Sequence, residues 1–230
     1  PVDPALAMRR AIAARMEKAN REIPHYHLDL DLDVTDALAR LEQRNATLPV
    51  EQRVLPAALL IWATARAAAR VPELNGHWVD GGFRPHPRVD VGIVVSLRRG
   101  GLVTPTLAGA DSLDVDTVMA ELRDMVSAAR TGTLRSSWMA EASLTVTLLG
   151  DNGADRVSGV IFPPQVALVG FGRIRQRPGI DAGIGRTDHA AMQHAGYAHV
   201  MDVDEFAGRL CGQIDARHRS ADDAVGARWL

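Results

Sequence analysis

The chain has 230 residues, of which 26 are lysine or arginine and 28 are aspartate or glutamate, giving a net charge of −2. This balance argues against nucleic acid as a partner, because proteins that bind nucleic acid carry an excess of basic side chains. The single lysine, Lys18, does not follow a glycine, which excludes a phosphate-binding Gly-Lys loop. The single cysteine, Cys211, excludes an intrachain disulfide and a zinc cluster. Lys18 also lies in a charged helical stretch, which excludes Schiff-base chemistry.

Three further features bear on where the protein acts. A single cysteine favours a reducing compartment, so we expect a cytoplasmic protein. The longest apolar stretch, residues 54–65, has about 12 residues against the roughly 20 that span a bilayer, so we expect no membrane segment. Because the chain opens at Pro1 and not at a methionine, we expect a processed form or a fragment of a longer polypeptide.

The first part of the chain predicts a helix followed by a strand. Asp3 followed by Pro4 favours a helix start, and Pro24 ends that helix. The run HYHLDLDLDV, residues 25–34, alternates polar and apolar residues, as a strand with one buried face does. The residues predicted on its buried face are Leu28, Leu30, Leu32 and Val34.

Two helices are predicted next. The first covers residues 36–46 and is capped by Thr35 or Asp36. The second is rich in alanine, opens at Pro56 and ends before Pro72.

The middle of the chain is predicted to be rich in strands. A short hairpin turns at Gly81-Gly82, and strands cover residues 89–97 and 102–107. An amphipathic helix then begins at Asp114 or Asp116 and continues to about Arg130. Its apolar stripe consists of Val118, Leu122, Met125 and Ala129.

The last part of the chain predicts further strands and a closing helix. Strand-like runs cover residues 143–150, 157–162 and 165–172. A loop at 179–189, a weak strand at 190–201 and a helix at 204–217 are expected to follow.

We expect one domain over residues 1–230, with residues 1–6 and 219–230 as tails, because no repeat or linker divides the chain. The alternation of helices and strands predicts an α/β fold, a two-layer sandwich in which helices cover a mixed β-sheet.

Two motifs suggest a cofactor, but neither fits one. A row of side chains on one face of the first strand comprises His25, His27, Asp29, Asp31 and Asp33. Alternate strand residues lie about 6.6 Å apart in a straight row, so they cannot converge on one ion. We interpret the row as a solvated sheet face or channel wall and expect no metal. The segment GFGRIR, residues 170–175, lacks the third glycine of a dinucleotide-binding fingerprint and predicts a strand end.

His199 and Thr147 are the candidate catalytic residues. Imidazole titrates near neutral pH, and Asp202, three residues after His199, can orient it as a general base. Thr147, at the end of a predicted strand, can donate a hydrogen bond to an oxyanion. Both also have a structural interpretation, as a packed histidine and an ordinary strand threonine.

Several segments occur in the order of a known family. They are MRRAIAARMEKANREIPHYHLDLDLDVT, VPELNGHW, GLVTPTL and GVIFPPQVALVGFGRI. Together they resemble the catalytic core of the dihydrolipoamide acyltransferases, the second component of 2-oxoacid dehydrogenase complexes. The resemblance covers roughly residues 7–215.

This resemblance implies a chloramphenicol-acetyltransferase-like fold that assembles as homotrimers, which build a larger core with the other components of the complex. It implies an active site at the trimer interface, where coenzyme A and a lipoyl group enter a channel from opposite ends. The lipoyl group is carried on a separate domain, and neither a lipoyl nor a subunit-binding domain is expected within this chain. A histidine removes the thiol proton, and a hydroxyl group holds the tetrahedral oxyanion.

The resemblance assigns roles to particular residues. Thr147 takes the place of the family's serine, and Leu148 replaces an asparagine. Arg9 or Arg10 matches the arginine that opens the family's core, which implies a pairing with Asp202 and a place on the coenzyme side of the site. An exposed helix arginine is the alternative.

The histidine motif departs from the family pattern Asp-His-Arg-Val-x-Asp-Gly and is one residue shorter. Counting forward from Thr147 places His199 on the catalytic histidine, whereas counting backward from the closing helix places Ala198 there. We adopt the first alignment. In it, Ala198 replaces the aspartate before the histidine, and Val203 replaces a glycine.

Three functions remain as hypotheses. The first is an acyltransferase core that moves an acyl group between coenzyme A and dihydrolipoyl groups. The second is a catalytically silent homologue that serves as a structural or binding core. The third is a coenzyme-A-dependent acyltransferase with a small acceptor other than the lipoyl group.

Overall fold

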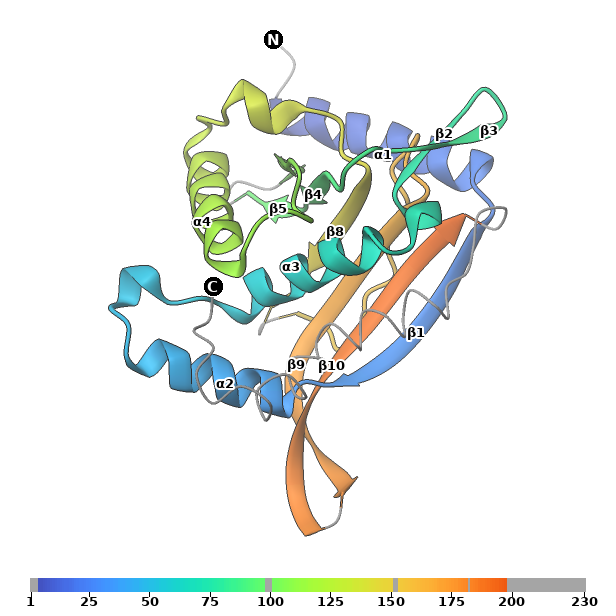
Figure 1. Ribbon diagram of the computed structural model, residues 1–230. Coiled ribbons are helices and arrows are strands. Elements are labelled where there is room, and N and C mark those ends of the chain that lie inside the picture. Colours follow the sequence, from blue (N-terminus) through green and yellow to red (C-terminus); the bar gives the residue numbers. More distant parts are fainter. Residues whose placement is uncertain (1–3, 98–100, 151–152, 182, 198–230) are drawn as a thin grey trace.

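The computed structural model describes residues 4–97, 101–150, 153–181 and 183–197. The helices of this part of the chain are α1 (Pro4–Glu22), α2 (Thr35–Ala46), α3 (Pro56–Ala68) and α4 (Val115–Thr131), with short 3-10 helices η1 (Val50–Gln52), η2 (Pro72–Leu74) and η3 (Ser136–Met139) (Figure 1). The strands are β1 (His25–Asp33), β2 (Gly76–Val79), β3 (Gly82–Pro85), β4 (Val91–Ile93), β5 (Val95–Ser96), β6 (Leu102–Val103), β7 (Thr106–Leu107), β8 (Leu144–Leu148), β9 (Ala167–Asp181) and β10 (Gly183–Tyr197).

Within these residues a six-stranded sheet has the order β1-β10-β9-β8-β4-β7. β8 runs parallel to both of its neighbours, β4 and β9, whereas the other pairs are antiparallel. The sheet is therefore mixed and is covered by helices, which confirms the predicted α/β fold class.

The two faces of the sheet pack against different parts of the chain. On the helical face, Val146 of β8 and Val169 of β9 belong to the main apolar core, which α3 and α4 complete. On the opposite face, named here the outer face, Leu168 of β9 packs with Ala19 and Ile23 at the end of α1. Figure 1 shows α3 and α4 on one side of the strands and α1 along their upper end.

α3 lies deepest in the main core. Its sequence, PAALLIWATARAA, places small and apolar residues on nearly every side of the helix. The helix can therefore be buried all round by the rest of the protein. Pro56 occupies the first turn, where its missing N–H has no helical partner to lose. The hydroxyl of the buried Thr64 donates to the carbonyl oxygen of Leu60 at 2.8 Å, so this polar group is satisfied inside the core.

α4 confirms the predicted amphipathic helix. The Asp114 carboxylate accepts a hydrogen bond from the Thr117 N–H at 2.7 Å, which identifies Asp114 rather than Asp116 as the cap. Gly132 ends the helix with φ of 75°, a left-handed conformation that glycine adopts without steric cost. All four residues predicted to form the apolar stripe are buried against the sheet: Val118, Leu122, Met125 and Ala129.

The predicted cap of α2 is wrong. Val34 holds the cap position without a side-chain hydrogen bond, while the Asp33 carboxylate accepts from the Thr35 N–H at 2.9 Å. β1 continues to Asp33, so this carboxylate is already next to the first turn of the helix.

The turn of the β2–β3 hairpin lies one residue earlier than predicted. Asp80 and Gly81 form it with φ of 53° and 74°, and Gly82 already pairs with Val79. Aspartate followed by glycine suits a two-residue hairpin turn, in which both central residues have positive φ.

Two predicted strands also differ from the structure. Residues 89–97 divide into β4, in the large sheet, and β5, which pairs with β6 in a separate small sheet. Residues 157–162 form no strand, because this segment runs over the outer face of β9, with Gly159 against Leu168, and not beside a strand of the sheet. Ile161 from this segment is instead fully buried in the cluster on the outer face.

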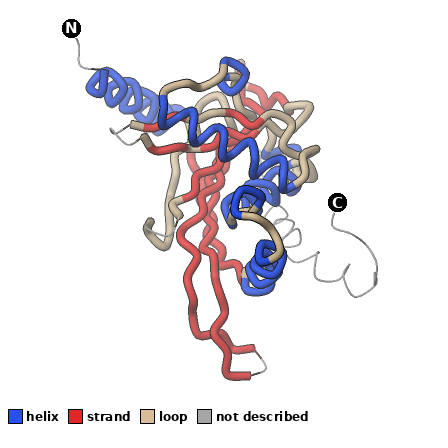
Figure 2. The backbone as a smooth tube through the Cα atoms, turned by 90° about the vertical axis from the view of Figure 1, so that its left-hand side faces the viewer, coloured by secondary structure: helices blue, strands red, loops and turns tan. Residues whose placement is uncertain are grey.

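The largest difference is the hairpin of β9 and β10. GFGRIR lies inside β9 rather than at its end, and residues 179–189 are strand rather than loop. Figure 2 shows the far part of this hairpin extending well beyond the helices. The sequence there shows no apolar alternation, because it is interrupted by Pro178, Gly179, Gly183 and Gly185. The two strands nevertheless stay paired through their backbones, which needs no such alternation.

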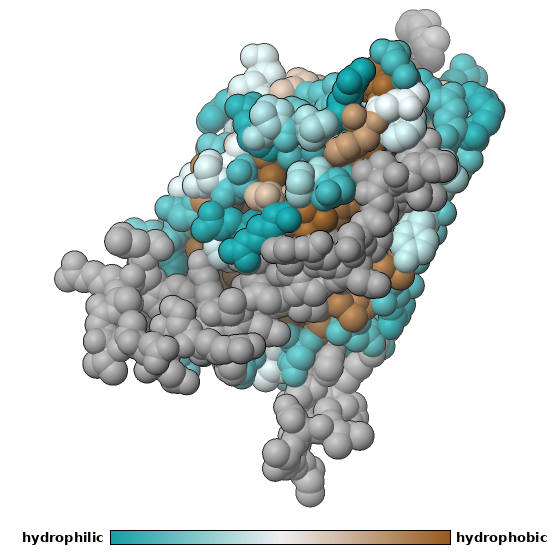
Figure 3. All heavy atoms as spheres, turned by 45° about the vertical axis from the view of Figure 1, so that its right-hand side comes forward, coloured by the Kyte–Doolittle hydropathy of each residue, from teal (hydrophilic) through white to brown (hydrophobic). Residues whose placement is uncertain are grey.

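The side of the molecule seen in Figure 3 is mainly hydrophilic, with apolar side chains in patches between polar ones. The large apolar side chains that are exposed in the described residues are Leu6, Tyr26, Val50, Leu55, Val79, Leu102 and Met139. No helix in the described ranges is long and apolar enough to cross a membrane. The predicted helix over residues 204–217 lies outside them.

Candidate active site

Thr147 lies near the end of β8, on the outer face of the sheet. Along the strand it alternates with Val146, whose side chain belongs to the main core on the helical face. In the parallel pairing Thr147 lies beside Gly170 of β9. Because Gly170 has no side chain, β9 contributes only backbone next to the half-buried Thr147.

Thr145 lies on the same face, two residues earlier, and has a different environment. It is fully buried, and its hydroxyl donates to Oε1 of Gln165 at 2.7 Å. Within the described part of the chain, the hydroxyl of Thr147 has no such partner. Of these two threonines, Thr147 is the one with a hydroxyl that can serve a substrate.

The row of polar residues on β1 faces solvent as predicted, except at its first residue. Nδ1 of His25 donates to the carbonyl oxygen of Ile23 at 2.9 Å, and Nε2 accepts from the Ile161 N–H at 3.0 Å. Burial lowers the pKa of His25, and the adjacent His27, which stacks on it with ring centroids 5.9 Å apart, acts in the same direction. His25 is therefore a neutral structural link between β1 and the segment before β9.

Arg9 and Arg10 lie on α1 and are exposed. Neither forms an ion pair with another described residue, and their predicted partner, Asp202, lies outside the described ranges. Their guanidinium groups thus remain accessible to an anionic ligand.

His199 also lies outside the described residues. β10 ends at Tyr197, which pairs with His25 at the start of β1. The roles predicted for His199 and Asp202 therefore stay predictions.

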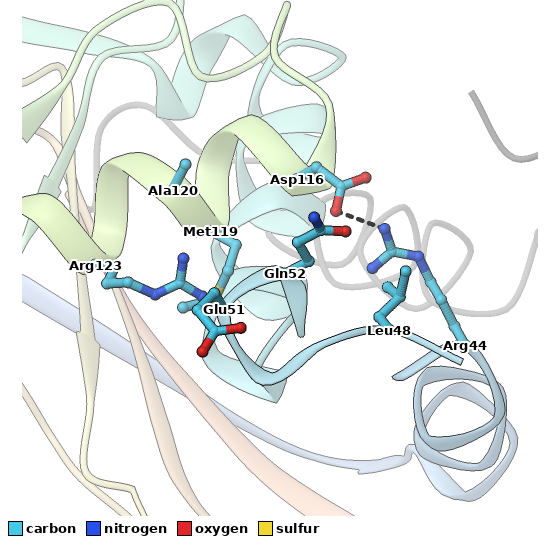
Figure 4. A pocket seen from close by; sticks show the side chains of 8 residues that line it. All are labelled: Arg44, Leu48, Glu51, Gln52, Asp116, Met119, Ala120 and Arg123. Carbon is cyan, nitrogen blue, oxygen red and sulfur yellow. Dashed lines mark hydrogen bonds and ion pairs between the residues drawn. The ribbon is translucent and has the colours of Figure 1, made fainter. Parts of the chain in front are cut away.

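A cavity of about 360 Å³ lies away from the predicted residues, between the end of α2, η1 and α4 (Figure 4). Nη2 of Arg44 pairs with Asp116 across it at 2.5 Å. Its charges balance, because Arg123 and Glu51 complete the charged lining. None of Thr147, Arg9 and Arg10 contributes to this cavity.

Metal-ligating side chains do not gather in the part of the chain that the structure describes. No group of three or more histidine, cysteine, aspartate or glutamate side chains there could hold an ion. The imidazole rings of His25 and His27 lie parallel and stacked, which is not the arrangement of two ligands converging on a metal.

One part of the outer face was not predicted from the sequence. Residues 153–161, named here the crossing segment, run over β9. At Gly172, a Cβ atom would overlap the backbone oxygen of Asp155. Gly172, the second glycine of GFGRIR, was therefore the one sequence signal for the crossing segment, because a residue without a side chain permits this close approach.

Comparison with known proteins tests the predicted family. The sequence profile described as 2-oxoacid dehydrogenases acyltransferase (catalytic domain) matches residues 2–205. A dihydrolipoyllysine-residue acetyltransferase component of the pyruvate dehydrogenase complex from Rickettsia bellii is 27% identical over 225 residues, covering 97% of this chain and 49% of that protein. The chain spans about half the length of the curated relatives that it matches.

Solved structures confirm the fold. Dihydrolipoamide acetyltransferase (E2p) from Azotobacter vinelandii matches with a TM-score of 0.85 at 20% identity, covering 95% of this chain and 93% of that chain. The cubic core of the pyruvate dehydrogenase multienzyme complex gives the same TM-score, identity and coverage. A chloramphenicol acetyltransferase matches with a TM-score of 0.61 at 14% identity, over 88% of this chain and 92% of that chain, which confirms the chloramphenicol-acetyltransferase-like architecture.

The profile match spans most of the chain, and the fold is that of the solved acetyltransferase structures. The chain therefore belongs to the family of 2-oxoacid dehydrogenase acyltransferase catalytic domains.

Proposed function

We propose that this chain is the acyltransferase core of a 2-oxoacid dehydrogenase complex and transfers an acyl group between dihydrolipoyl groups and coenzyme A. The observation that carries the proposal is Thr147, a half-buried hydroxyl beside Gly170 on the outer face of the sheet. Family membership across residues 2–205 supports the reaction class.

The reaction needs one base and one oxyanion donor. His199, with a neutral imidazole, takes the proton from the attacking thiol, and the thiolate adds to the thioester carbonyl carbon. The hydroxyl of Thr147 donates a hydrogen bond to the oxyanion of the tetrahedral intermediate. When that intermediate collapses, the carbon–sulfur bond of the donor breaks, and the leaving thiolate takes the proton back from His199.

The spacing of the two residues supports this assignment. In the Azotobacter protein, a serine, a histidine and an asparagine were investigated for their role in the catalytic mechanism. That serine and histidine are separated by the same number of residues as Thr147 and His199. In the adopted alignment, which is one residue short after His199, Asp202 stands where the Azotobacter protein has its asparagine, so the third residue is replaced here.

A catalytically silent core is the second candidate function. Ala198 and Val203 favour it, because they replace an acidic residue and a glycine of the motif that this chain resembles. In that case the chain would contribute its fold and surface to the complex without turnover.

The coenzyme, partners and location complete the proposal. Coenzyme A acts as a substrate whose phosphates meet Arg9 and Arg10, because guanidinium groups bind phosphate strongly. The chain assembles as a homotrimer and then into a larger core with the other components of the complex, in the cytoplasm, while lipoyl groups arrive on separate domains. The fold shared with a cubic core supports assembly.

The test is an acyl-transfer assay on the full chain. Thiol release from acetyl-, propionyl- and branched acyl-coenzyme A is followed with dihydrolipoamide, for the wild type and His199→Ala. We expect turnover with at least one donor and a loss of about 100-fold or more in the variant. A wild type with no more activity than His199→Ala contradicts the catalytic function. A trimer or larger particle in that case supports the silent core.

A further inference from the structure

The crossing segment is fitted closely to the outer face of β9. Its Ala154 carbonyl oxygen accepts from the Arg173 N–H at 3.2 Å, and the Asp155 backbone lies directly over Gly172. Further along, a Cβ atom at Gly159 would overlap the Leu168 side chain. The segment therefore travels along β9 from Gly172 back to Leu168.

This path takes the segment past Thr147. Gly170, the partner of Thr147 on β9, lies midway between Gly172 and Leu168 and shares their face by strand alternation. Neighbouring strands are about 4.8 Å apart, so Thr147 lies one strand away from the backbone under the crossing segment. The crossing segment thus lies beside the outer-face position of Thr147 and is called here the wall of the Thr147 site.

Ion pairs hold this wall at its beginning. The carboxylate of Asp155 accepts from Nε of Arg173 at 2.6 Å and pairs with Nη1 of Arg175 at 2.5 Å. Between Phe171 and Ile174, β9 has one more residue than β10 opposite it. This bulge lets Arg173 and Arg175 both approach Asp155.

A second set of ion pairs ties the same segment to the edge strand. Arg156 pairs with Asp31 at 2.9 Å and with Asp29 at 3.7 Å, both on β1. The polar row on β1 therefore has a structural partner. Of the two anchors, Asp155 is the more enclosed, with its side chain 32% exposed against 44% for Arg156.

We propose that Asp155 is a positioning residue for the Thr147 site, because it fixes the crossing segment against Arg173 and Arg175 and so holds the wall beside which a substrate binds. Asp155 does not touch the reacting atoms. The inference rests on the proposed function, and it predicts that loosening the segment weakens substrate binding more than it slows the chemical step.

The test compares Asp155→Asn, which removes the charge and keeps the shape, with Asp155→Glu, which retains the charge. In the full chain, with the acyl donor that the wild type uses best, we expect KM for that donor or for dihydrolipoamide to rise about fivefold in Asp155→Asn, with kcat within about twofold. Asp155→Glu should return KM to within about twofold of the wild type. Asp124→Asn on α4, which removes an exposed ion pair with Arg135 in the loop after that helix, is the matched control and should leave both constants unchanged.

Amide hydrogen exchange supplies a measurement that needs no activity. Peptides covering residues 153–161 should exchange about tenfold faster in Asp155→Asn and at the wild-type rate in Asp124→Asn. If Asp155→Asn does not fold, Arg175→Gln, which removes one of the two partners, replaces it with the same expected direction.

Two results overturn the inference alone: exchange equal to the wild type, or faster exchange with unchanged KM in an active enzyme. A wild type without transferase activity overturns the proposed function and the inference with it, so the two failures are distinguishable.

Discussion

At the scale of single residues, Thr145 and Thr147 share a strand and a face but differ in what surrounds them. Gln165 satisfies the hydroxyl of Thr145 inside the protein, and a buried hydroxyl with a fixed partner stabilises the fold. Thr147 lies beside Gly170, where the neighbouring strand has no side chain. A difference of two residues along β8 thus separates a structural threonine from the candidate oxyanion donor.

Replacing Thr147 tests that role. Thr147→Ala should lower kcat about 100-fold to 1,000-fold with little change in KM, because the hydrogen bond is made to the transition state. Thr147→Ser keeps the hydroxyl and should retain kcat within about tenfold. Steady-state kinetics on both variants provide the measurement, and Thr131→Ala, at an exposed hydroxyl on α4, is the control. Full kcat in Thr147→Ala would remove Thr147 from the mechanism.

His25 predicts a pH dependence of stability. Its Nε2 accepts the Ile161 N–H, and burial lowers its pKa below the ordinary value of 6.5, so the folded chain prefers neutral imidazole. At pH values above that ordinary pKa, His25 is neutral in both the folded and the unfolded chain, and its contribution to the free energy of unfolding is complete. As the pH falls below it, the unfolded chain takes up the proton first and stability is lost until the folded pKa is passed.

Chemical denaturation at several pH values between 5 and 8 measures this effect. We expect the free energy of unfolding of the wild type to fall more steeply toward acid than that of His25→Gln. His27→Gln removes a smaller cause of the lowered His25 pKa and should therefore make the slope shallower by less than His25→Gln does. Parallel pH curves for His25→Gln and the wild type would contradict the role of His25.

At the scale of elements, α4 shows how local sequence rules and packing agree. Its cap, its apolar stripe and its C-terminal glycine are all short-range features, and each has its expected place. The hairpin of β9 and β10 behaves oppositely: its far part contains proline and glycines, and its strands are held by pairing with each other.

The cap of α4 can be tested by mutation. Asp114→Ala should lower the free energy of unfolding by about 1 kcal/mol, because the N–H of Thr117 loses its acceptor. The Thr117 hydrogen bond also lowers the pKa of Asp114, so this contribution should disappear as the pH falls through the folded pKa. Urea denaturation measures both. Asp124→Ala, inside the same helix, should cost less than about 0.5 kcal/mol, and an equal loss in both variants would contradict the capping role.

At the scale of the whole molecule, the two faces of the mixed sheet differ in what they carry. The helical face contains most of the apolar core, whereas the outer face carries Thr147, the crossing segment and the end of α1. Arg9 and Arg10 lie nearer the beginning of that helix, where Met8 lies against Gly101 beside β6.

Much of this architecture was predictable from the sequence. Helix starts at Pro4 and Pro56, the alternation of β1 and the stripe of α4 depend on residues close in the chain, and family motifs supplied the fold. The strand predicted at residues 157–162 was wrong, because this segment runs over the outer face of β9 and not along an edge of the sheet.

By itself, the sequence determined the fold class and the family, since these depend on local patterns and on motifs in order, and it predicted a role for the hydroxyl of Thr147. Only the tertiary structure decided that Thr145 is satisfied by Gln165, that His25 joins two segments, and that Asp155 lies between Arg173 and Arg175. These contacts join residues that are distant in the chain or meet at a bulge, and no spacing rule specifies them. They exist because the path of the backbone over Gly172 brings the charges together.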